Sequence, residues 1–285
     1  MFNQLKTLLL LSLLTGLTVT VGRAIGGPSG GVIALGLAAI MNISSWWFSD
    51  KIVLAMNGAR EIGPDDAPRL WAIVTDLAQR AKMPMPRVYV IPQMQPNAFA
   101  TGRSPSHAAV AVTEGILRAM PDDELRGVLA HELGHVHNRD TLIMAAAATA
   151  AGAISMLASM ARWSMIFGGM SRRDDDRGGG GLEAVVAIIV APLAATLIQL
   201  AVSRSREYGA DEFSARLLGD ATPLMRALNR LERGVEAIPA DVSPSFAHVY
   251  IVNPLSAKGI MSLFRTHPLT EERIARLQAV AAELR

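Results

Sequence analysis

Four long apolar stretches are the feature that most constrains how this 285-residue chain can fold. They run over residues 5–21, 31–48, 141–160 and 182–202. The third and fourth exceed the ~18 residues that mark a candidate membrane-spanning helix. The second ends in Trp46-Trp47, an aromatic pair typical of a membrane interface, and a Gly/Pro-rich turn separates it from the first. The pattern predicts about four transmembrane helices in two hairpins.

Three of these stretches also allow other interpretations. The first could be a signal peptide, although no A-x-A-like cleavage site follows it and a second apolar stretch comes at once. The third and fourth are hydrophobic enough to be buried helices of a large soluble domain instead.

The composition agrees with membrane segments and limits the kinds of site that the chain can build. Hydrophobic residues make up 51% of the chain and aromatic residues only 5%, so aliphatic side chains and Met supply the excess. A net charge of +2 without a dense Lys/Arg stripe argues against nucleic acid as a partner. Because cysteine is absent, disulfides, zinc ribbons and thiol nucleophiles are excluded, and any metal must be bound by His, Asp or Glu.

The segments between the apolar stretches predict a mainly helical α+β domain with a small sheet. We divide the chain into a hairpin over 1–48, a first domain part over 49–140, a second hairpin over 141–202 and a second domain part over 203–285. Periodicity and terminal signals predict helices from Pro68, over 121–141, over 204–219, from Thr222 and over 269–284, and strands over 87–91 and 108–113. The run RRDDDRGGGG at 172–181 is typical of a flexible loop.

The run His131-Glu132-Leu133-Gly134-His135 lies on the helix predicted over 121–141. Residues four apart project from the same face, so the two imidazoles can both bind Zn²⁺ at ~2.0–2.1 Å. Glu132 is displaced around the helix, where it can accept a proton from the attacking water rather than coordinate. Gly134 is expected to keep the surface beside His135 open. The plain alternative is a pair of helical histidines that pack or face solvent.

A catalytic zinc site needs a third protein ligand and an open fourth position. The metzincin pattern would place a histidine where Thr141 stands, so the ligand must come from elsewhere. Glu207 and Asp211 lie one turn apart on the helix predicted over 204–219. We expect Glu207 to be the ligand, and Asp211 to accept the second N–H of a ligating histidine and fix its tautomer. The alternative is a solvated helix with charges at i, i+4.

The order of the two motifs along the chain tests the topology. The histidine pair precedes the third apolar stretch and Glu207 follows the fourth, so the ligands share one membrane side only if both stretches span. Along continuous helices, His135 and Glu207 would lie within ~10 Å of the apolar segments. The ligand-bearing helices are therefore expected to continue as membrane helices.

Together these motifs resemble the HtpX family of membrane-bound zinc metalloproteases, which are of the gluzincin type and distantly related to the prenyl-protein proteases. The resemblance covers nearly the whole chain, including both apolar hairpins. It rests on NAFATG (97–102), VLAHELGHVHNRD (128–140), SRSREYGAD (203–211) and THPLTEERIARL (266–277). It implies that His131, His135 and Glu207 bind one Zn²⁺ per chain and that Glu132 is the catalytic base.

The resemblance also implies a multi-pass protein of the plasma (inner) membrane with its active site facing the cytoplasm. Such an enzyme hydrolyses internal peptide bonds of misfolded or surplus membrane proteins, a quality-control role in stress responses. A small excess of Lys and Arg on the catalytic side agrees with this orientation.

Two further assignments follow from the family pattern. Asn97, Ala98, Phe99 and Ala100 resemble an edge strand that binds an extended substrate by main-chain hydrogen bonds, although an ordinary turn is equally compatible. His267 could donate to the carbonyl oxyanion, although a surface histidine before a helix is equally compatible.

Two other classes of protein remain open on the residues alone. One is a membrane protein with a structural or sensory zinc site and no proteolytic activity. The other is a transporter or scaffold with an accidental motif, which predicts no stoichiometric zinc. Nothing in the residues indicates an oligomeric state.

Overall fold

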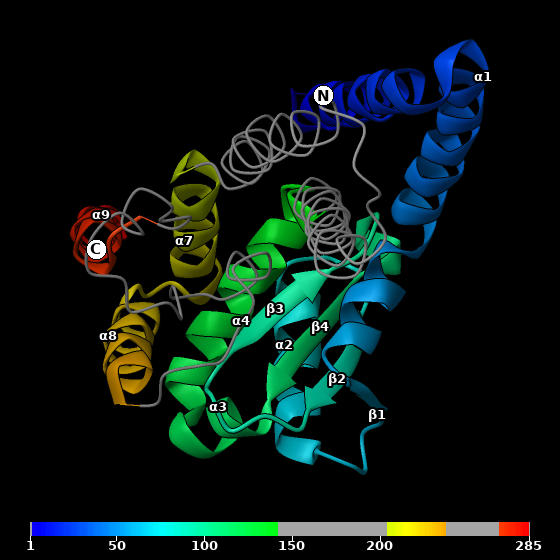
Figure 1. The fold of residues 1–285 in the computed structure, drawn as a ribbon. Coiled ribbons are helices and arrows are strands. Elements are labelled where there is room, and N and C mark those ends of the chain that lie inside the picture. Colours follow the sequence, from blue (N-terminus) through cyan, green and yellow to red (C-terminus); the bar gives the residue numbers. More distant parts are fainter. Residues whose placement is uncertain (1, 142–203, 238–267, 285) are drawn as a thin grey trace.

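The computed structural model describes residues 2–141, 204–237 and 268–284 (Figure 1). These residues form a mainly helical α+β fold with one small sheet, as predicted. The second hairpin, the loop at 172–181 and His267 lie outside the described residues. Within the described part of the chain, no helix combines the length and the apolar character needed to cross a membrane.

The N-terminal segment is one sharply bent helix rather than two helices joined by a loop. Helix α1 (Phe2–Met56) contains the predicted Gly/Pro turn, where Gly27 has a φ of 64° and Pro28 follows. Glycine accepts this left-handed φ, and proline removes a backbone hydrogen bond, so the helix changes direction near its label in Figure 1. The helix continues past the predicted boundary at residue 48. Whether residues 1–48 form a membrane hairpin stays a prediction.

The sheet has four strands in the order β1-β2-β4-β3. They are β1 (Arg60–Ile62), β2 (Arg87–Ile91), β3 (Ala98–Thr101) and β4 (Ala109–Thr113). Strands β2 and β4 are parallel neighbours, and β1 and β3 flank them as antiparallel edges. The two predicted strands are confirmed. Residues 98–101 form an edge strand rather than a turn, and β1 was not predicted.

Helices cover both faces of the sheet. The last turns of α1 pack on one face, where Val53 and Leu54 contact Phe99 and neighbouring strand residues. Helices α2 (Pro68–Arg80) and α4 (Asp122–His137) pack on the other face in the main apolar core. All five residues of β4 are buried, because this strand has covered faces and neighbours on both sides.

Helix α4 is the centre of the fold. Helices α7 (Arg204–Leu218), α8 (Thr222–Ala237) and α9 (Thr270–Glu283) lie on its side away from the sheet (Figure 1). Polar contacts also join them to α4: for example, Arg230 forms an ion pair with Glu124, and Ser214 Oγ donates to the carbonyl of Gly127 at 2.8 Å. These predicted helices are confirmed, whereas the short helix α3 (Glu114–Ala119) and the 3₁₀ turn η1 (Pro105–His107) were not predicted.

Candidate active site

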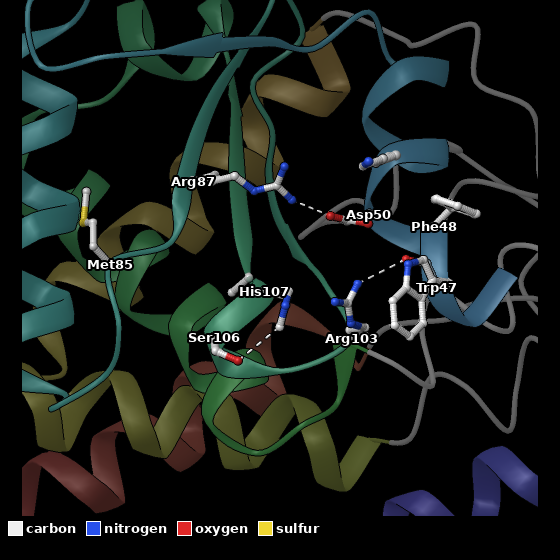
Figure 2. A pocket seen from close by; sticks show the side chains of 10 residues that line it. Trp47, Phe48, Asp50, Met85, Arg87, Arg103, Ser106 and His107 are labelled. Atoms are coloured by element: carbon white, nitrogen blue, oxygen red, sulfur yellow. Dashed lines mark hydrogen bonds and ion pairs between the residues drawn. The ribbon is translucent and has the colours of Figure 1, made fainter. Parts of the chain in front are cut away.

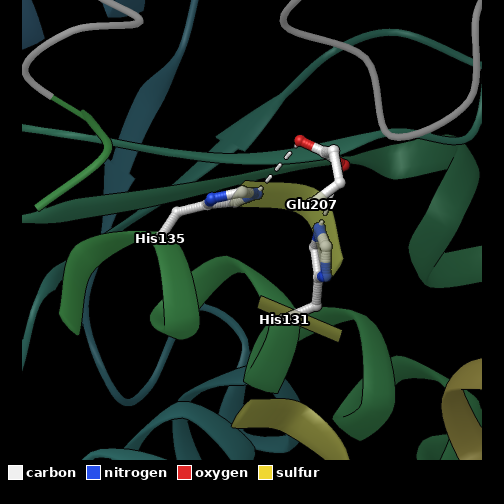
Figure 3. A group of neighbouring side chains, drawn as sticks. All are labelled: His131, His135 and Glu207. Carbon is white, nitrogen blue, oxygen red and sulfur yellow. Dashed lines mark ion pairs between the residues drawn. The ribbon is translucent and has the colours of Figure 1, made fainter. Parts of the chain in front are cut away.

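The two predicted histidine ligands are buried one turn apart on α4. His131 and His135 are 1% and 3% exposed, and their rings meet edge to face with centroids 4.8 Å apart. Helix α7 carries Glu207 to the same place. Figure 3 shows both imidazoles pointing toward its carboxylate. The structure therefore brings together the three residues that the sequence proposes as ligands.

The spacing of these side chains fits a metal ion better than direct hydrogen bonds. The Glu207 carboxylate oxygens lie 3.5 Å from His135 Nε2 and 3.7 Å from His131 Nε2. Direct hydrogen bonds between charged groups of this kind are ~2.7–2.9 Å long. Ligand atoms ~2.0–2.1 Å from a tetrahedral zinc are instead ~3.4 Å apart. One donor atom from each residue lies within 4.8 Å of the other two, so the cluster can hold a metal ion.

Gly134 serves helix packing rather than an open surface beside His135. A Cβ atom at this position would lie 3.1 Å from Ala210 Cα and 3.3 Å from Ala210 Cβ, both on α7. The expectation of an open surface was therefore wrong. Glycine lets α4 and α7 approach closely, and this close approach brings Glu207 within reach of the histidines.

His131 is held by residues from two other helices. Its Nδ1 lies 2.9 Å from Asp211 Oδ1 on α7, so Nδ1–H donates to the carboxylate and Nε2 is left to face Glu207. Arg273 on α9 donates to both oxygens of Asp211, at 2.6 and 2.9 Å, and its Nη1 lies 3.7 Å from Glu207. Asp211 thus lies where it can orient His131, and its support of a zinc-ligating histidine stays a prediction.

The charges of this group offset one another in the interior. Arg273 is 1% exposed and Asp211 is 2% exposed. Burial by itself would raise the pKa of Asp211, but the Arg273 guanidinium and the hydrogen bond from His131 outweigh it and lower that pKa. Asp211 therefore stays ionised and can orient His131.

His135 is held by a residue close to it in the chain. The predicted helix over 121–141 ends earlier, at His137, and Arg139 then adopts a left-handed φ of 59°. The turn brings Asp140 back, with its N–H bonded to the His135 carbonyl at 2.9 Å and its Oδ2 at 3.2 Å from His135 Nδ1. Thr141 Oγ1 then donates to the Gly102 carbonyl at 2.7 Å. The expected uninterrupted helix from His135 into the third apolar stretch is therefore wrong.

The pKa of His135 follows from this environment. Burial disfavours its charged form, but Asp140, Glu207 and Glu132 together outweigh burial and raise the pKa to about 9. A metal ion that binds Nε2 would therefore displace a proton from His135 near neutral pH.

Glu132 lies beside the ligands but is held by the sheet. It is 4% exposed, and its Oε2 accepts the backbone N–H of Ala100 in β3 at 2.8 Å. Burial raises the pKa of Glu132 above its ordinary value, against the opposing charges of His131 and His135. The carboxylate thus lies beside the two histidines with a raised affinity for a proton.

Successive residues of the edge strand β3 direct their main-chain groups to opposite sides of the strand. The main-chain groups of Asn97 bond to Thr113 at 2.9 Å, and the register then directs those of Phe99 toward β4 as well. The main-chain groups of Ala98 and Ala100 point away from β4, toward the side where Glu132 lies. Of the four residues assigned to substrate, only these two alanines present main-chain groups at the outer edge.

Two residues of the site were missed by sequence reasoning. Asp140 becomes a partner of His135 only because the chain turns at Arg139. Arg273 lies 62 residues from Asp211 in the chain, but its spacing from the buried Thr270 and Leu277 offered a signal. An arginine within the buried stripe of an amphipathic helix requires a buried partner.

Comparison with known proteins identifies the family. The model of peptidase family M48 matches residues 64–281. A protein named Protease HtpX homolog from Aquifex aeolicus (strain VF5) is 54% identical over 94% of this chain and 90% of its own length. One of the same name from Sulfurihydrogenibium sp. (strain YO3AOP1) is 53% identical over 100% of this chain and 98% of its own.

A solved structure has the same fold. The crystal structure of S. mikatae Ste24p matches 93% of this chain and 65% of its own chain, with a TM-score of 0.51 and 21% identity. The prediction of an HtpX-like zinc metalloprotease is confirmed by the family and its relatives, and the chain belongs to peptidase family M48.

Proposed function

We propose that this chain is a membrane-integrated, zinc-dependent endopeptidase whose catalytic centre is formed by His131, His135, Glu207 and Glu132. The observation that supports this most directly is the meeting of these four buried side chains from α4 and α7. Two imidazoles and a carboxylate are a donor set typical of catalytic zinc, and a fourth position stays available for water or substrate.

Different residues of the chain have different roles in the proposed peptide hydrolysis. A bound zinc ion would make a water molecule acidic near neutral pH and polarise the carbonyl of the scissile bond. Glu132 accepts the proton of the attacking water and passes it to the leaving nitrogen, and its raised pKa suits both transfers. Asp211 and Asp140 keep the two imidazoles oriented with Nε2 toward the centre.

The edge strand β3 is the surface on which we expect a polypeptide substrate to bind. An extended peptide can add to a sheet edge through main-chain hydrogen bonds, which tolerate many sequences. Ala98 offers an N–H and a C=O on that side, and Ala100 offers a C=O beside Glu132. This geometry would bring a backbone carbonyl of the substrate past the zinc centre.

The membrane setting and biological role belong to the same proposal. The four apolar stretches support integration into the plasma membrane, and both relatives carry the name Protease HtpX homolog. We infer a catalytic domain that faces the cytoplasm and degrades misfolded or surplus membrane proteins. His267, in the run THPLT that resembles the family pattern, is the proposed donor to the oxyanion.

The decisive test is Glu132→Gln in the full-length chain. Loss of the base should lower kcat by about 10²- to 10⁴-fold on a casein or membrane-protein substrate while one zinc per chain stays bound. Glu114→Gln is a matched control, because Glu114 is partly exposed on α3 and pairs only with Arg118 within the described residues. Cleavage by Glu132→Gln at the wild-type rate would refute the assignment of the base.

Zinc measurement separates the alternatives. A wild-type chain that binds one zinc but cleaves nothing, with or without a chelator, would instead support a structural or sensory metal site. Cleavage that survives full removal of the metal would exclude zinc from the reaction.

A further inference from the structure

A second site lies away from the catalytic centre, between the end of α1 and the sheet. It is a cavity of about 430 Å³, within the ~300–1,000 Å³ typical of small-molecule pockets. Figure 2 shows Trp47 and Phe48 of α1 on one side, Arg87 and Met85 on the other, and Arg103 beside Trp47. The mechanism of peptide hydrolysis uses none of these residues.

The lining is cationic and aromatic. It contains Lys51, Arg87 and Arg103 but only one carboxylate, Asp50, which forms an ion pair with Arg87. Neither Lys51 nor Arg103 forms an ion pair within the described residues. The cavity therefore has an excess of positive charge that suits an anion.

The two cations without acidic partners are held against aromatic rings. The Arg103 guanidinium carbon lies 4.5 Å from the ring centroid of Trp47, and Nη1 donates to the Trp47 carbonyl at 3.3 Å. Lys51 Nζ lies 5.6 Å from the ring centroid of Phe48. These contacts orient the cations without neutralising their charge. Because an arginine held in one orientation can bind two oxygens at once, Arg103 is suited to a phosphate.

The neighbourhood indicates where that phosphate comes from. Six aliphatic side chains of α1 are 50–71% exposed: Val32, Ile33, Leu35, Leu37, Ile40 and Ile43. This exposed apolar segment leads directly to Trp47 and Phe48 in the cavity wall. An exposed apolar surface of this extent marks a site of interaction. An aromatic and basic boundary at its end is the pattern found at the headgroup level of a membrane.

A second apolar stretch of the sequence begins beside the same cavity. Thr141, where the third stretch starts, donates to the Gly102 carbonyl, and Gly102 precedes Arg103 in the chain. The cavity therefore lies next to the ends of two of the four apolar stretches.

We infer that this cavity binds the phosphate of an anionic membrane phospholipid, with Arg103 and Lys51 as its main contacts. The bound headgroup would fix the sheet and its edge strand at a set height against the membrane. The inference rests on the proposed function only in placing the domain at a membrane. Its test measures lipid binding rather than cleavage, so the two can fail separately.

The test is native mass spectrometry of the full-length chain in mild detergent, titrated with phosphatidylglycerol, phosphatidylcholine or inorganic phosphate. We expect one preferred phosphatidylglycerol site, with Arg103→Gln and Lys51→Gln each weakening it about fivefold and the double variant about 25-fold. Arg103→Lys should keep most of the affinity. Arg118→Gln, which removes an exposed arginine from α3, should change nothing.

Several results would overturn the inference. Equal affinity for the two lipids, or an unchanged phosphatidylglycerol affinity in the double variant, would show that this cavity does not bind an anionic headgroup. If inorganic phosphate competes for the site and the site shows no preference for lipid, the ligand of the cavity would be a free anion rather than a lipid headgroup. A change in oligomeric state in place of lipid binding would make the patch a contact between copies. Thermal unfolding by circular dichroism checks that each variant is folded. If Arg103→Gln does not fold, the inference is tested with Lys51→Gln, because Lys51 is exposed.

Discussion

The two histidines of the proposed catalytic centre are four residues apart, yet different parts of the fold hold them. His131 is oriented by Asp211 on α7, which in turn binds the buried Arg273 of α9. His135 is oriented by Asp140, five residues further along the same chain segment. One half of the site thus depends on packing among three helices, and the other half depends on a single tight turn.

Because of this difference, the two aspartates are expected to contribute unequally to the stability of the fold, although both orient a histidine. Asp211 and Arg273 form a buried ion pair, and removing Asp211 leaves the Arg273 charge in the interior with the more distant Glu207 in place of its closest partner. Asp140 pairs with a histidine that can lose its proton, and the charge of the buried Arg206 is offset by Glu207 as well as by Asp140, so removal of Asp140 leaves that charge partly compensated. We therefore expect both aspartates to matter for zinc and only Asp211 to matter strongly for folding.

The largest loss of zinc affinity is expected at Glu207, which faces both histidines. Glu207→Ala removes the proposed zinc ligand that faces both histidines, so zinc affinity should fall by more than about 100-fold, measured by competition with a metal-chelating dye. Glu212→Ala is the control, because Glu212 is exposed on the same helix and pairs with Arg216. An unchanged metal content in Glu207→Ala would move the third ligand elsewhere.

Asp211→Asn should show most clearly that the His131 half of the site also stabilises the fold. It deprives the buried Arg273 charge of its closest acidic partner, so the free energy of unfolding should fall by up to about 3–5 kcal/mol, seen as a lower Tm of the zinc-free protein. The double variant Asp211→Asn/Arg273→Gln should regain part of that loss. If Asp211→Asn unfolds at the wild-type temperature, the pair does not stabilise the helices as we argue.

Asp140→Asn should affect zinc with little effect on stability. Loss of a carboxylate that orients a ligating histidine typically costs 10–100-fold in metal affinity, and we expect a value in that range. The Tm of the zinc-free protein should change much less than in Asp211→Asn. A loss of stability as large as that of Asp211→Asn would contradict the contrast between the halves.

The smallest effect is expected at the turn itself. Arg139 has a left-handed φ, which costs a non-glycine residue about 1–2 kcal/mol. Arg139→Gly removes this strain but adds entropy to the unfolded chain, so stability should rise by less than about 1 kcal/mol, with zinc affinity unchanged. Lys82→Gly is the matched control, because Lys82 also has a positive φ, of 53°, in the turn after α2. A lower zinc affinity in Arg139→Gly alone would mean that the side chain itself supports the site.

The parts of the site that follow helical spacing could be predicted from the sequence. His131 and His135 repeat at one turn, and so do Glu207 and Asp211, because local geometry decides which helical residues share a face. The helices that carry them were predicted to within a few residues, except that α4 ends at His137 rather than near residue 141.

The parts that depend on turns or distant contacts could not be predicted in this way. On a continuing helix, residue 140 would point about 140° away from His135, so only the turn at Arg139 makes Asp140 a partner. Arg273 needs Asp211, and no local rule joins residues so far apart in the chain. Strand β1 has three residues, too few for a periodic signal. His267 and the second hairpin stay predictions.

The placement of the ligands on α4 and α7 also has a consequence for the timing of synthesis. The ribosome makes the sheet and both histidines well before it reaches Glu207, and it makes Arg273 later still. A nascent chain that has completed α4 holds only two of the three metal ligands. Because the proposed ligand set is incomplete at that stage, a nascent chain is not expected to cleave its own early segments while they emerge unfolded.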